Sequence, residues 1–478
     1  MNPLGAIHRL GVHVPRLRLP RAVIAESIAW ANSQARGAKG ARAIGNWDED
    51  ALTLAAEAAR GCDPSGGGAP IASVMLCSTS APFADRDTAA LLATVLDLDE
   101  ALETMNLGGS LRAATTGLAN AARRQGAASL LVASDARQTR AGSPQELSYG
   151  DAAVAMLVGP SQPGALATVL ATMSVSSDFV DHYRMSEATF DYALEERWLR
   201  DESLLKLVPR VTAELLARAG VGAEAIRHLI LPTSAATAKR LASAAGLAAA
   251  KRDERVLAEC GDAGVALPLL MLAAALEVAA PGELILLIGL GQGIDALLVR
   301  AESGPAAARK PLAEALARRR EEPSYVRYLS HRGLLQVDFG MRAERDQRTA
   351  HTVAYREREA VAAFKGGRCQ RCGTVQFPLS RVCVAPDCRA TDTQAAHRLA
   401  DSRGRVKSFT EDWQAYAARP PYVYGNVEFA EGGNLLMEFT DVEPGELAVG
   451  DAVRFVFRIK DEDRARQFRR YFWKATKA

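Results

Sequence analysis

The chain has 478 residues, more than one hydrophobic core commonly supports, so we expect two or three domains. Its composition, 48% hydrophobic and 24% charged, is that of a globular protein, and its net charge of +2 argues against a dedicated polyanion binder. We find no secretory signal and no run of about 18 uncharged apolar residues, and therefore expect a cytoplasmic protein with no membrane contact.

Residues 1–300 alternate short strands with alanine-rich helices, a pattern that predicts a layered α/β fold. The predicted strands are 72–79, 128–135, 153–159, 228–234 and 284–291. The predicted helices are 51–60, 87–96, 111–124, 213–220 and 265–277.

An internal repeat runs through this region. Residues 109–135 and 261–291 each show a glycine, an apolar helix, a glycine break and a strand, and residues 149–159 and 289–300 add a hairpin strand to each copy. Parallel α/β sheets in general share some of this pattern, but we favour a true duplication. Two glycine-entered helix N-termini would then face one pocket, where they would stabilise negative charge.

These segments resemble the thiolase superfamily, and within it the hydroxymethylglutaryl-CoA synthase branch. SLRAATTGLANAA (110–122) is similar to the nucleophile-helix segment, and SYGDAAVAMLVG (148–159) to the glycine-alanine hairpin. Residues 178–210 are similar to the insertion that marks the synthase branch. The resemblance implies a duplicated thiolase-like fold with layers α-β-α-β-α, an acyl-CoA ester as substrate with CoA as part of it, and at least a homodimer.

The positions that carry chemistry in this family depart from its pattern. Leu111 falls where the resemblance implies a nucleophilic cysteine, Thr233 where it implies a histidine, and Asp262 where it implies an asparagine. The synthase glutamate falls in CSTSAPF, where we find only the hydroxyl residues 78–80. An acyl thioester needs a thiolate acceptor, so the resemblance predicts a family member without its own acyl-transfer nucleophile.

Three other side chains are candidate acid–base residues, each with a structural alternative. His182 pairs with a neighbouring aspartate, or caps the insertion. Tyr149 faces the pocket, or belongs to the turn around Gly150. Asp262 acts as a general base, or as a helix N-cap.

Four residues near the two glycine turns are candidate substrate contacts: Ser110, Arg112, Thr233 and Gly264. Arg112, inside an apolar helix start, either orients a substrate or forms an internal ion pair. Cys77 and Cys260 are expected to be small core hydrophobes, and Cys62 is expected in a Gly/Ser loop.

Four of the seven cysteines fall at Cys369-x2-Cys372-x10-Cys383-x4-Cys388. Two short cysteine hairpins supply four thiolates for tetrahedral Zn(II), and in a reducing compartment such clusters indicate a metal rather than disulfides. Four protein ligands leave no open position, so we predict a structural zinc.

Short alternating strands follow the cysteines at 405–413, 422–430, 434–442 and 452–460, which predicts a small OB-type β-barrel. Residues 364–474 resemble the rubredoxin-like zinc ribbon and OB-fold domains that accompany acyl-CoA enzymes. Nucleic-acid binding by the arginines and aromatics of 464–474 is a weaker alternative, because acidic residues 461–463 lie beside them.

The predicted organisation is a synthase-like domain (1–330), a linker with a helix (331–363), a zinc ribbon (364–395) and an OB-fold domain (396–478). The leading hypothesis is the synthase-like, zinc-bearing component of a thiolase/acyltransferase complex, with a separate thiolase subunit as partner. The alternatives are a cysteine-independent retro-aldolase acting on β-hydroxyacyl-CoA, and a non-catalytic CoA-binding pseudo-synthase. We do not expect a nucleic-acid partner.

Overall fold

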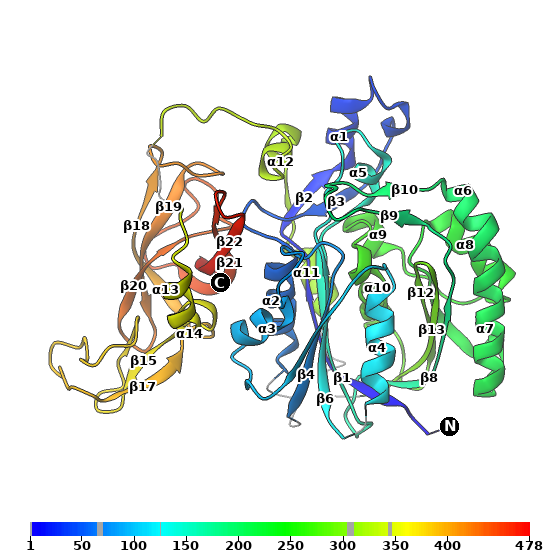
Figure 1. Ribbon diagram of the computed structural model, residues 1–478, viewed down its shortest axis with the longest axis horizontal. Coiled ribbons are helices and arrows are strands. Elements are labelled where there is room, and N and C mark those ends of the chain that lie inside the picture. Colours follow the sequence, from blue (N-terminus) through cyan, green and yellow to red (C-terminus); the bar gives the residue numbers. More distant parts are fainter. Residues whose placement is uncertain (1, 65–69, 125, 304–309, 343–346) are drawn as a thin grey trace. The chain divides into compact units, whose positions relative to one another are not determined.

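The computed structural model describes residues 2–64, 70–124, 126–303, 310–342 and 347–478. The chain divides into two compact units (Figure 1). The first comprises residues 1–45, 50–90 and 99–332, and the second comprises 46–49, 91–98 and 333–478. Each unit is described by itself below.

A mixed nine-stranded sheet forms the centre of the first unit, in the order β11-β12-β13-β8-β1-β7-β6-β4-β5. Its strands are β1 (Gly5–His13), β4 (Ile71–Cys77), β5 (Glu103–Leu107), β6 (Ala128–Asp135), β7 (Ala152–Gly159), β8 (Ala167–Ser176), β11 (Ile226–Ile230), β12 (Leu284–Leu290) and β13 (Gly293–Ala301).

The strand pairings reveal the duplication that the sequence predicts. In the first half, β4 is parallel to β6, β6 is antiparallel to β7, and β7 is antiparallel to β1. In the second half, β11 is parallel to β12, β12 is antiparallel to β13, and β13 is antiparallel to β8. A short antiparallel pairing of β1 with β8 joins the halves.

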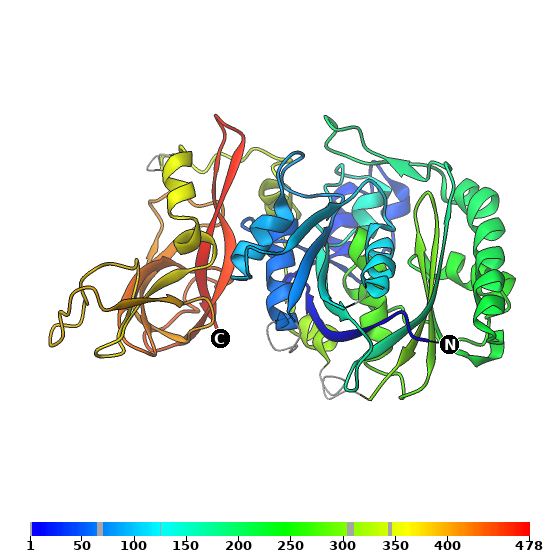
Figure 2. The ribbon, with the colours of Figure 1, turned by 60° about the horizontal axis from the view of Figure 1, so that its bottom comes forward.

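Two repeat helices, α4 (Ala113–Arg123) and α10 (Leu267–Leu276), lie in one buried core with residues from both halves of the sheet. Helices α7 (Leu205–Ala219) and α8 (Ala235–Ala244) cover the opposite face of the second half. Along β12, Ile285 and Leu287 face the first core while Leu286 and Ile288 face the second, as expected for a strand buried on both sides. Both views show α7 along the outside of β8 and β13 (Figures 1 and 2).

Close contact between α4 and the second half depends on glycine. A Cβ added at Gly289 of β12 would lie 2.0 Å from Oγ1 of Thr115 on α4. Only glycine leaves room for the helix here, so the two halves approach each other beside the start of α4.

The predicted insertion leads from β8 into α7. It contains the hairpin β9 (His182–Tyr183) and β10 (Tyr192–Ala193), the short helix α6 (Glu196–Trp198) and the π-helical turn η3 (Leu199–Leu204). Phe179 stacks on Trp198 with ring centroids 6.2 Å apart, which connects the start of the insertion to α6.

The remaining elements of the first unit form short connections. They are β2 (Leu17–Pro20), α1 (Arg21–Ile28), η1 (Ser33–Ala35), β3 (Ala41–Ile44), α2 (Ala51–Cys62), α3 (Thr88–Val95, whose residues from 91 on group with the second unit), α5 (Pro144–Ser148), η4 (Ala223–Ala225), α9 (Arg255–Glu259), η5 (Gly264–Ala266), α11 (Pro311–Ala317), β14 (Arg320–Glu321) and α12 (Tyr325–His331). Strands β2, β3 and β14 make a separate small sheet. Cys62 ends α2 and is buried, so its expected place in a loop was wrong.

The second unit contains two small sheets. Helices α13 (His351–Arg356) and α14 (Arg358–Ala362) fall in the predicted linker, and linker residues 343–346 lie outside the described ranges. A three-stranded sheet joins β15 (Lys365–Cys369), β16 (Val375–Gln376) and β17 (Gln394–Arg398). A five-stranded antiparallel sheet joins β18 (Gly404–Asp412), β19 (Tyr422–Phe429), β20 (Asn434–Glu438), β21 (Ala452–Asp463) and β22 (Phe468–Lys477).

Aromatic side chains fill the core of the second unit. Phe364 contacts several rings at centroid distances from 5.3 to 6.4 Å, among them Phe377, Phe455 and Trp473. Three arginines beside β22 pair with the acidic residues next to them, namely Arg466 with Asp463, Arg469 with Glu462 and Arg470 with Asp461. The C-terminal aromatics Tyr471 and Trp473 therefore serve packing, and these arginines carry local ion pairs.

Within the described ranges, no helix combines the length and apolar character needed to cross a bilayer.

Candidate functional site

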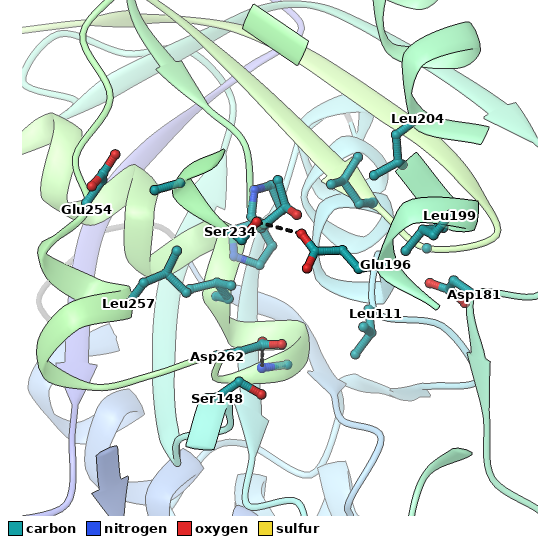
Figure 3. Close-up of a pocket in the computed structure, with 18 of the residues that line it drawn as sticks. Leu111, Ser148, Asp181, Glu196, Leu199, Leu204, Ser234, Glu254, Leu257 and Asp262 are labelled. Atoms are coloured by element: carbon teal, nitrogen blue, oxygen red, sulfur yellow. Dashed lines mark hydrogen bonds between the residues drawn. The ribbon is translucent and has the colours of Figure 1, made fainter. Parts of the chain in front are cut away.

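A cavity of about 660 Å³, here called the central cavity, opens in the first unit where both halves and the insertion meet (Figure 3). Its lining residues are Arg21, Ala38, Lys39, Leu111, Leu147, Ser148, Phe179, Asp181, Glu196, Leu199, Ser203, Leu204, Pro232, Thr233, Ser234, Ala235, Glu254, Leu257, Ala258, Asp262, Gly264, Leu267, Pro268 and 290–293.

The structure brings together the three positions to which the resemblance assigns chemistry. Leu111 precedes α4, Thr233 follows β11, and Asp262 precedes η5, yet all three line the central cavity. Gly264 lines it as well. The repeat explains this convergence, because equivalent turns of two duplicated halves meet at one place.

Ser110 and Arg112 are not among the cavity-lining residues. The hydroxyl of Ser110 donates to the main-chain oxygen of Gly291 at 2.9 Å. The guanidinium of Arg112 donates to the same oxygen at 3.0 Å and to Oδ1 of Asp295 at 2.9 Å. Arg112 therefore forms the internal ion pair and fastens the start of α4 to the hairpin of the second half.

Asp262 presents a carboxylate held on one side. Its Oδ1 accepts the backbone N–H of Gly264 at 2.9 Å and lies 3.0 Å from Nη2 of Arg137. The main-chain oxygen of Asp262 accepts from Arg137 at 2.8 Å and from the N–H of Gly150 at 2.9 Å. The side chain is 31% exposed. The N-cap of η5 is Ala263, so Asp262 does not hold the predicted N-cap position. It lies one residue earlier, accepts the first N–H of that turn and lines the cavity.

Tyr149 lies behind Asp262 and does not line the cavity. The guanidinium of Arg137 is 3.6 Å from the centre of its ring, and its hydroxyl donates to Oδ2 of Asp191 at 3.1 Å. Burial raises the pKa of Tyr149, and although Arg137 lowers it, Asp191 raises it further. The hydroxyl therefore stays protonated at neutral pH.

His182 also stands one residue away from the cavity, which Asp181 lines. Nδ1 of His182 is 3.0 Å from Oδ1 of Asp181. Burial would lower the pKa of His182, but the hydrogen bond and charge of Asp181 raise it above its ordinary value. Burial would likewise raise the pKa of Asp181, which His182 lowers. The pair therefore favours an imidazolium beside a carboxylate.

Glu196 is a cavity residue that the sequence analysis missed. Its Oε1 accepts from the hydroxyl of Ser234 at 2.7 Å and from that of Thr237 at 2.8 Å (Figure 3). These hydrogen bonds lower the pKa of Glu196. Ser234 is also the N-cap of α8, so this carboxylate lies at a helix N-terminus, where negative charge is favoured. Nothing in the local sequence EERW distinguishes Glu196 from a surface glutamate.

The hydroxyl residues at the expected synthase-glutamate position surround a different carboxylate. Asp135, at the end of β6, accepts from the side chains of Ser78, Thr79 and Ser80 and from the backbone N–H groups of residues 79 and 80. Its Oδ2 also accepts the N–H of Val265 at 3.0 Å. We expected the N–H groups at the glycine turn of the second repeat to face a ligand. Those of Gly264 and Val265 donate instead to the carboxylates of Asp262 and Asp135.

No cysteine lies among the residues that line the central cavity. Cys77 and Cys260 are fully buried, with their sulfurs 3.6 Å from the main-chain oxygen of Ala113 and 3.7 Å from that of Asp151. Burial raises the pKa of Cys260 to about 12 and raises that of Cys77 as well. Both thiols remain protonated and unreactive at neutral pH.

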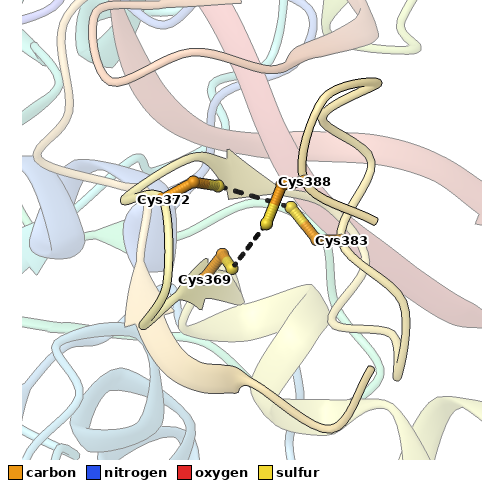
Figure 4. A group of neighbouring side chains, drawn as sticks. All are labelled: Cys369, Cys372, Cys383 and Cys388. Carbon is orange, nitrogen blue, oxygen red and sulfur yellow. Dashed lines mark hydrogen bonds between the residues drawn. The ribbon is translucent and has the colours of Figure 1, made fainter. Parts of the chain in front are cut away.

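The second unit gathers the four predicted metal ligands. The sulfurs of Cys369, Cys372, Cys383 and Cys388 all lie within 4.8 Å of one another (Figure 4). Cys369 and Cys388 are 3.9 Å apart, and Cys372 and Cys383 are 3.6 Å apart. Tetrahedral Zn(II) with Zn–S bonds of about 2.3 Å requires sulfur separations of about 3.8 Å, so the donor set fits a metal of this kind. Strands β15 and β16 hold the first pair in place.

Comparisons with known proteins connect each unit to a group of relatives. Residues 397–458 match the family model of the ChsH2 C-terminal OB-fold domain. The hydroxymethylglutaryl-CoA synthase of Aeropyrum pernix is 28% identical over 349 residues, covering 69% of this chain and 95% of the relative. A DUF35 domain-containing scaffold protein of Methanothermobacter thermautotrophicus is 31% identical over 104 residues, covering 20% of this chain and 74% of the relative.

Solved structures agree with these relatives on the fold. MvaS in complex with 3-hydroxy-3-methylglutaryl coenzyme A superposes with a TM-score of 0.58 at 21% identity, covering 70% of this chain and 93% of that one. The 3-oxoacyl-(acyl carrier protein) synthase III of Pseudomonas aeruginosa gives 0.54 at 20% identity, covering 63% and 98%. The predicted thiolase-like fold and the OB-fold are confirmed.

Proposed function

Because the chain belongs to the DUF35-domain family and joins that domain to a thiolase-like fold related to hydroxymethylglutaryl-CoA synthase, we propose that it acts on acyl-CoA esters. The reaction class is the formation or cleavage of a carbon–carbon bond in the acyl group. The central cavity, where both halves meet, is the proposed site, and CoA enters it as part of the substrate.

We propose a role in a complex with a thiolase because no cysteine is among the residues that line the cavity. Moving an acyl group from CoA onto an enzyme requires a thiolate at the reacting carbonyl. Leu111 stands before α4, at the position where the resemblance implies a nucleophilic cysteine, and Cys77 and Cys260 are fully buried in the core. A separate thiolase subunit therefore supplies the thiol, and this chain is the synthase-like, metal-bearing component of that complex.

Purification from the native host tests this assignment. We expect a thiolase with an accessible active-site cysteine to co-elute in stoichiometric amount, identified by mass spectrometry, and the complex to contain at least two copies of this chain. A homodimer that turns over acyl-CoA esters without a second protein would contradict it.

Asp262 supports a second candidate function, cysteine-independent retro-aldol cleavage of a β-hydroxyacyl-CoA. Its carboxylate would take the proton of the β-hydroxyl, and the Cα–Cβ bond would break to give a carbonyl compound and an acyl-CoA enolate. The enolate carbon would then take a proton, returned by the Asp262 carboxyl, to give free acyl-CoA. The enolate oxygen needs a hydrogen-bond donor. Leu111 lines the cavity, and its backbone N–H donates to no acceptor among the described residues.

The two functions separate in an assay of the purified chain alone. Retro-aldol activity predicts release of free acyl-CoA from a β-hydroxyacyl-CoA, with a loss of about a hundredfold in Asp262→Asn. Full activity of Asp262→Asn would show that Asp262 is not the general base. Binding of acyl-CoA without turnover, alone and with a thiolase present, would instead support the pseudo-synthase alternative.

The four cysteines of the second unit are proposed to hold structural Zn(II). All four donors come from the protein, and their separations match one tetrahedral ion. A site closed in this way orients the ribbon of β15–β17 and has no position for a substrate.

A further inference from the structure

We infer that the acyl group bound in the central cavity carries no charge of its own, so that the chain selects an aliphatic monoacyl-CoA over a dicarboxylic one. This inference rests on the proposed function and names its substrate class. It sets this chain apart from relatives whose names specify a hydroxymethylglutaryl group, which ends in a free carboxylate.

Carboxylates dominate the polar lining of the cavity. Asp181, Glu196, Glu254 and Asp262 line it, from four separate places in the chain. Asp181 and Glu196 both have lowered pKa values, through His182 and through the hydroxyls of Ser234 and Thr237 respectively. Both are therefore ionised at neutral pH. The imidazolium of His182 compensates Asp181 in part, so Glu196 is the member of this pair whose charge repels a ligand carboxylate beside it.

The cations in and behind the lining offset this charge only in part, because His182 pairs with Asp181 and Arg137 with Asp262, whereas Glu196 and Glu254 form no such ion pair among the described residues. Arg21 uses its guanidinium on main-chain oxygens, with distances of 2.6 Å to Leu147, 3.1 Å to Lys39, 3.1 Å to Leu257 and 3.3 Å to Ala258. Arg137, which neutralises Asp262 in part, is 4% exposed and lies behind it. Lys39 also lines the cavity from an exposed position, as Glu196 and Glu254 do, so solvent and salt screen all three charges and one lysine stands against two carboxylates.

Apolar side chains make up most of the other walls. Leu111, Leu199, Leu204, Leu257, Leu267 and Leu290 all line the cavity. An aliphatic chain gains free energy as these leucines remove it from water. A carboxylate placed among them loses hydration and meets like charges instead of a partner, a combination that the protein interior strongly disfavours.

Two esters of equal carbon number test this inference on the full-length, metal-loaded chain. Calorimetric titration at neutral pH compares pentanoyl-CoA with glutaryl-CoA, which differ by one terminal carboxylate. We expect pentanoyl-CoA to bind tighter by about tenfold, because the terminal carboxylate of glutaryl-CoA loses hydration against the leucines and also meets the charges of Glu196 and Glu254.

Variants of Glu196 and Glu254 test whether the carboxylates of the lining cause the preference for pentanoyl-CoA. Glu196→Gln and Glu254→Gln should each improve glutaryl-CoA binding by about threefold and change pentanoyl-CoA binding by less than about twofold. Glu254 has no hydrogen bond that its replacement would break within the described residues, so this variant tests the charge even if Glu196→Gln disturbs α6. Glu26→Gln, which removes an exposed carboxylate of α1 outside the cavity, is the matched control and should change neither ester.

Three outcomes would count against the inference. Equal or tighter binding of glutaryl-CoA would overturn it, and so would a loss of glutaryl-CoA binding alone in Lys39→Gln by about tenfold, since Lys39 would then pair with the acyl carboxylate. If neither ester binds, the proposed function fails together with the inference. If both bind alike, the proposed function stands and only the charge selectivity is lost.

Discussion

Arg137 holds Asp262 twice, through Oδ1 at 3.0 Å and through the main-chain oxygen at 2.8 Å. The ion pair with Oδ1 and the hydrogen bond to the main-chain oxygen hold both the carboxylate and the turn that carries it. The same guanidinium covers the ring of Tyr149. A cavity-lining side chain of the second half is therefore positioned by a buried residue that follows β6 of the first.

Replacing Arg137 by alanine should lower the free energy of unfolding by about 3 kcal/mol, because it leaves a partly buried carboxylate without its cation. Urea denaturation of the full chain measures this. The control is Arg124→Ala, which breaks the exposed pair with Glu103 and should cost less than about 1 kcal/mol. Similar losses of unfolding free energy in the two variants would show that the Arg137–Asp262 pair contributes no more than an exposed ion pair.

Removing the hydroxyl of Ser234 should raise the pKa of Glu196 towards that of an ordinary glutamate. The hydroxyl donates to the ionised carboxylate and stabilises that form, so its loss favours the protonated form. Carboxyl-carbon NMR titration of Ser234→Ala against the unaltered chain measures the shift. Ser186→Ala, in the same insertion but without a contact to Glu196 among the described residues, should leave the pKa in place, and an unchanged value in Ser234→Ala would contradict the assigned cause.

A cysteine introduced at position 111 should be accessible to small electrophiles. Leu111 lines the cavity, whereas Leu118 on the same helix is fully buried. We expect iodoacetamide to alkylate Leu111→Cys at least about tenfold faster than Leu118→Cys, as peptide mass mapping would show. Equal rates would mean that the cavity does not reach the start of α4.

Loss of one ribbon cysteine should release the metal. Cys372→Ser removes one of four donors, and we expect metal content to fall from about one ion per chain to near zero, with loss of order in 364–398. Elemental analysis gives the content, and hydrogen exchange reports the order. Cys62→Ala, which removes a buried thiol of the other unit, should keep the metal; full metal content in both variants would rule out the four-cysteine site.

The second unit should lose stability in acid. Burial alone would raise the pKa of Glu438, but Lys474 and Lys460, with the hydroxyl of Tyr422, lower it to about 2. A depressed carboxyl pKa contributes stability that is present above the unfolded value near 4.5 and disappears as the pH falls towards 2. The contribution is about 3 kcal/mol at neutral pH.

Thermal unfolding from pH 6 to pH 2 tests this, with Glu438→Gln as the variant whose pH dependence should be flatter over that window. Glu428→Gln, on an exposed position of the neighbouring strand β19, is the control and should follow the unaltered chain. A curve for Glu438→Gln that is as steep as that of the unaltered chain would show that another group controls acid unfolding.

The sequence predicted most of the fold because its signals are local and periodic. Apolar strand segments, glycine turns and the repeat at 109–135 and 261–291 lead to the duplicated sheet, and the spacing of four cysteines leads to the cluster. The repeat also explains why Leu111, Thr233 and Asp262 could be placed at one cavity. Residues that occupy equivalent turns of two halves converge wherever the halves pack together.

Other features depend on the path of the chain in space, which no short pattern encodes. Glu196 reaches the cavity because the insertion returns to the start of α8, and its partners lie 38 and 41 residues away. In the sequence nothing distinguishes Arg137 from a surface arginine, because its contact with the Tyr149 ring is seen only in the folded structure. The helix predicted at 51–60 extends two residues further, so Cys62 ends α2 and does not lie in a loop.

The carboxylate of Asp135 connects the two duplicated halves through hydrogen bonds. Six donors from two distant segments, residues 78–80 and Val265, converge on it, so one side chain acts as a brace between the duplicated halves. A change at Asp135 should therefore disturb the ends of β4 and β6 and the start of η5 together. The insertion, which supplies Phe179, Glu196 and Leu199 to the cavity lining, is joined to the halves by separate contacts, among them those of Ser234 and Thr237 with Glu196.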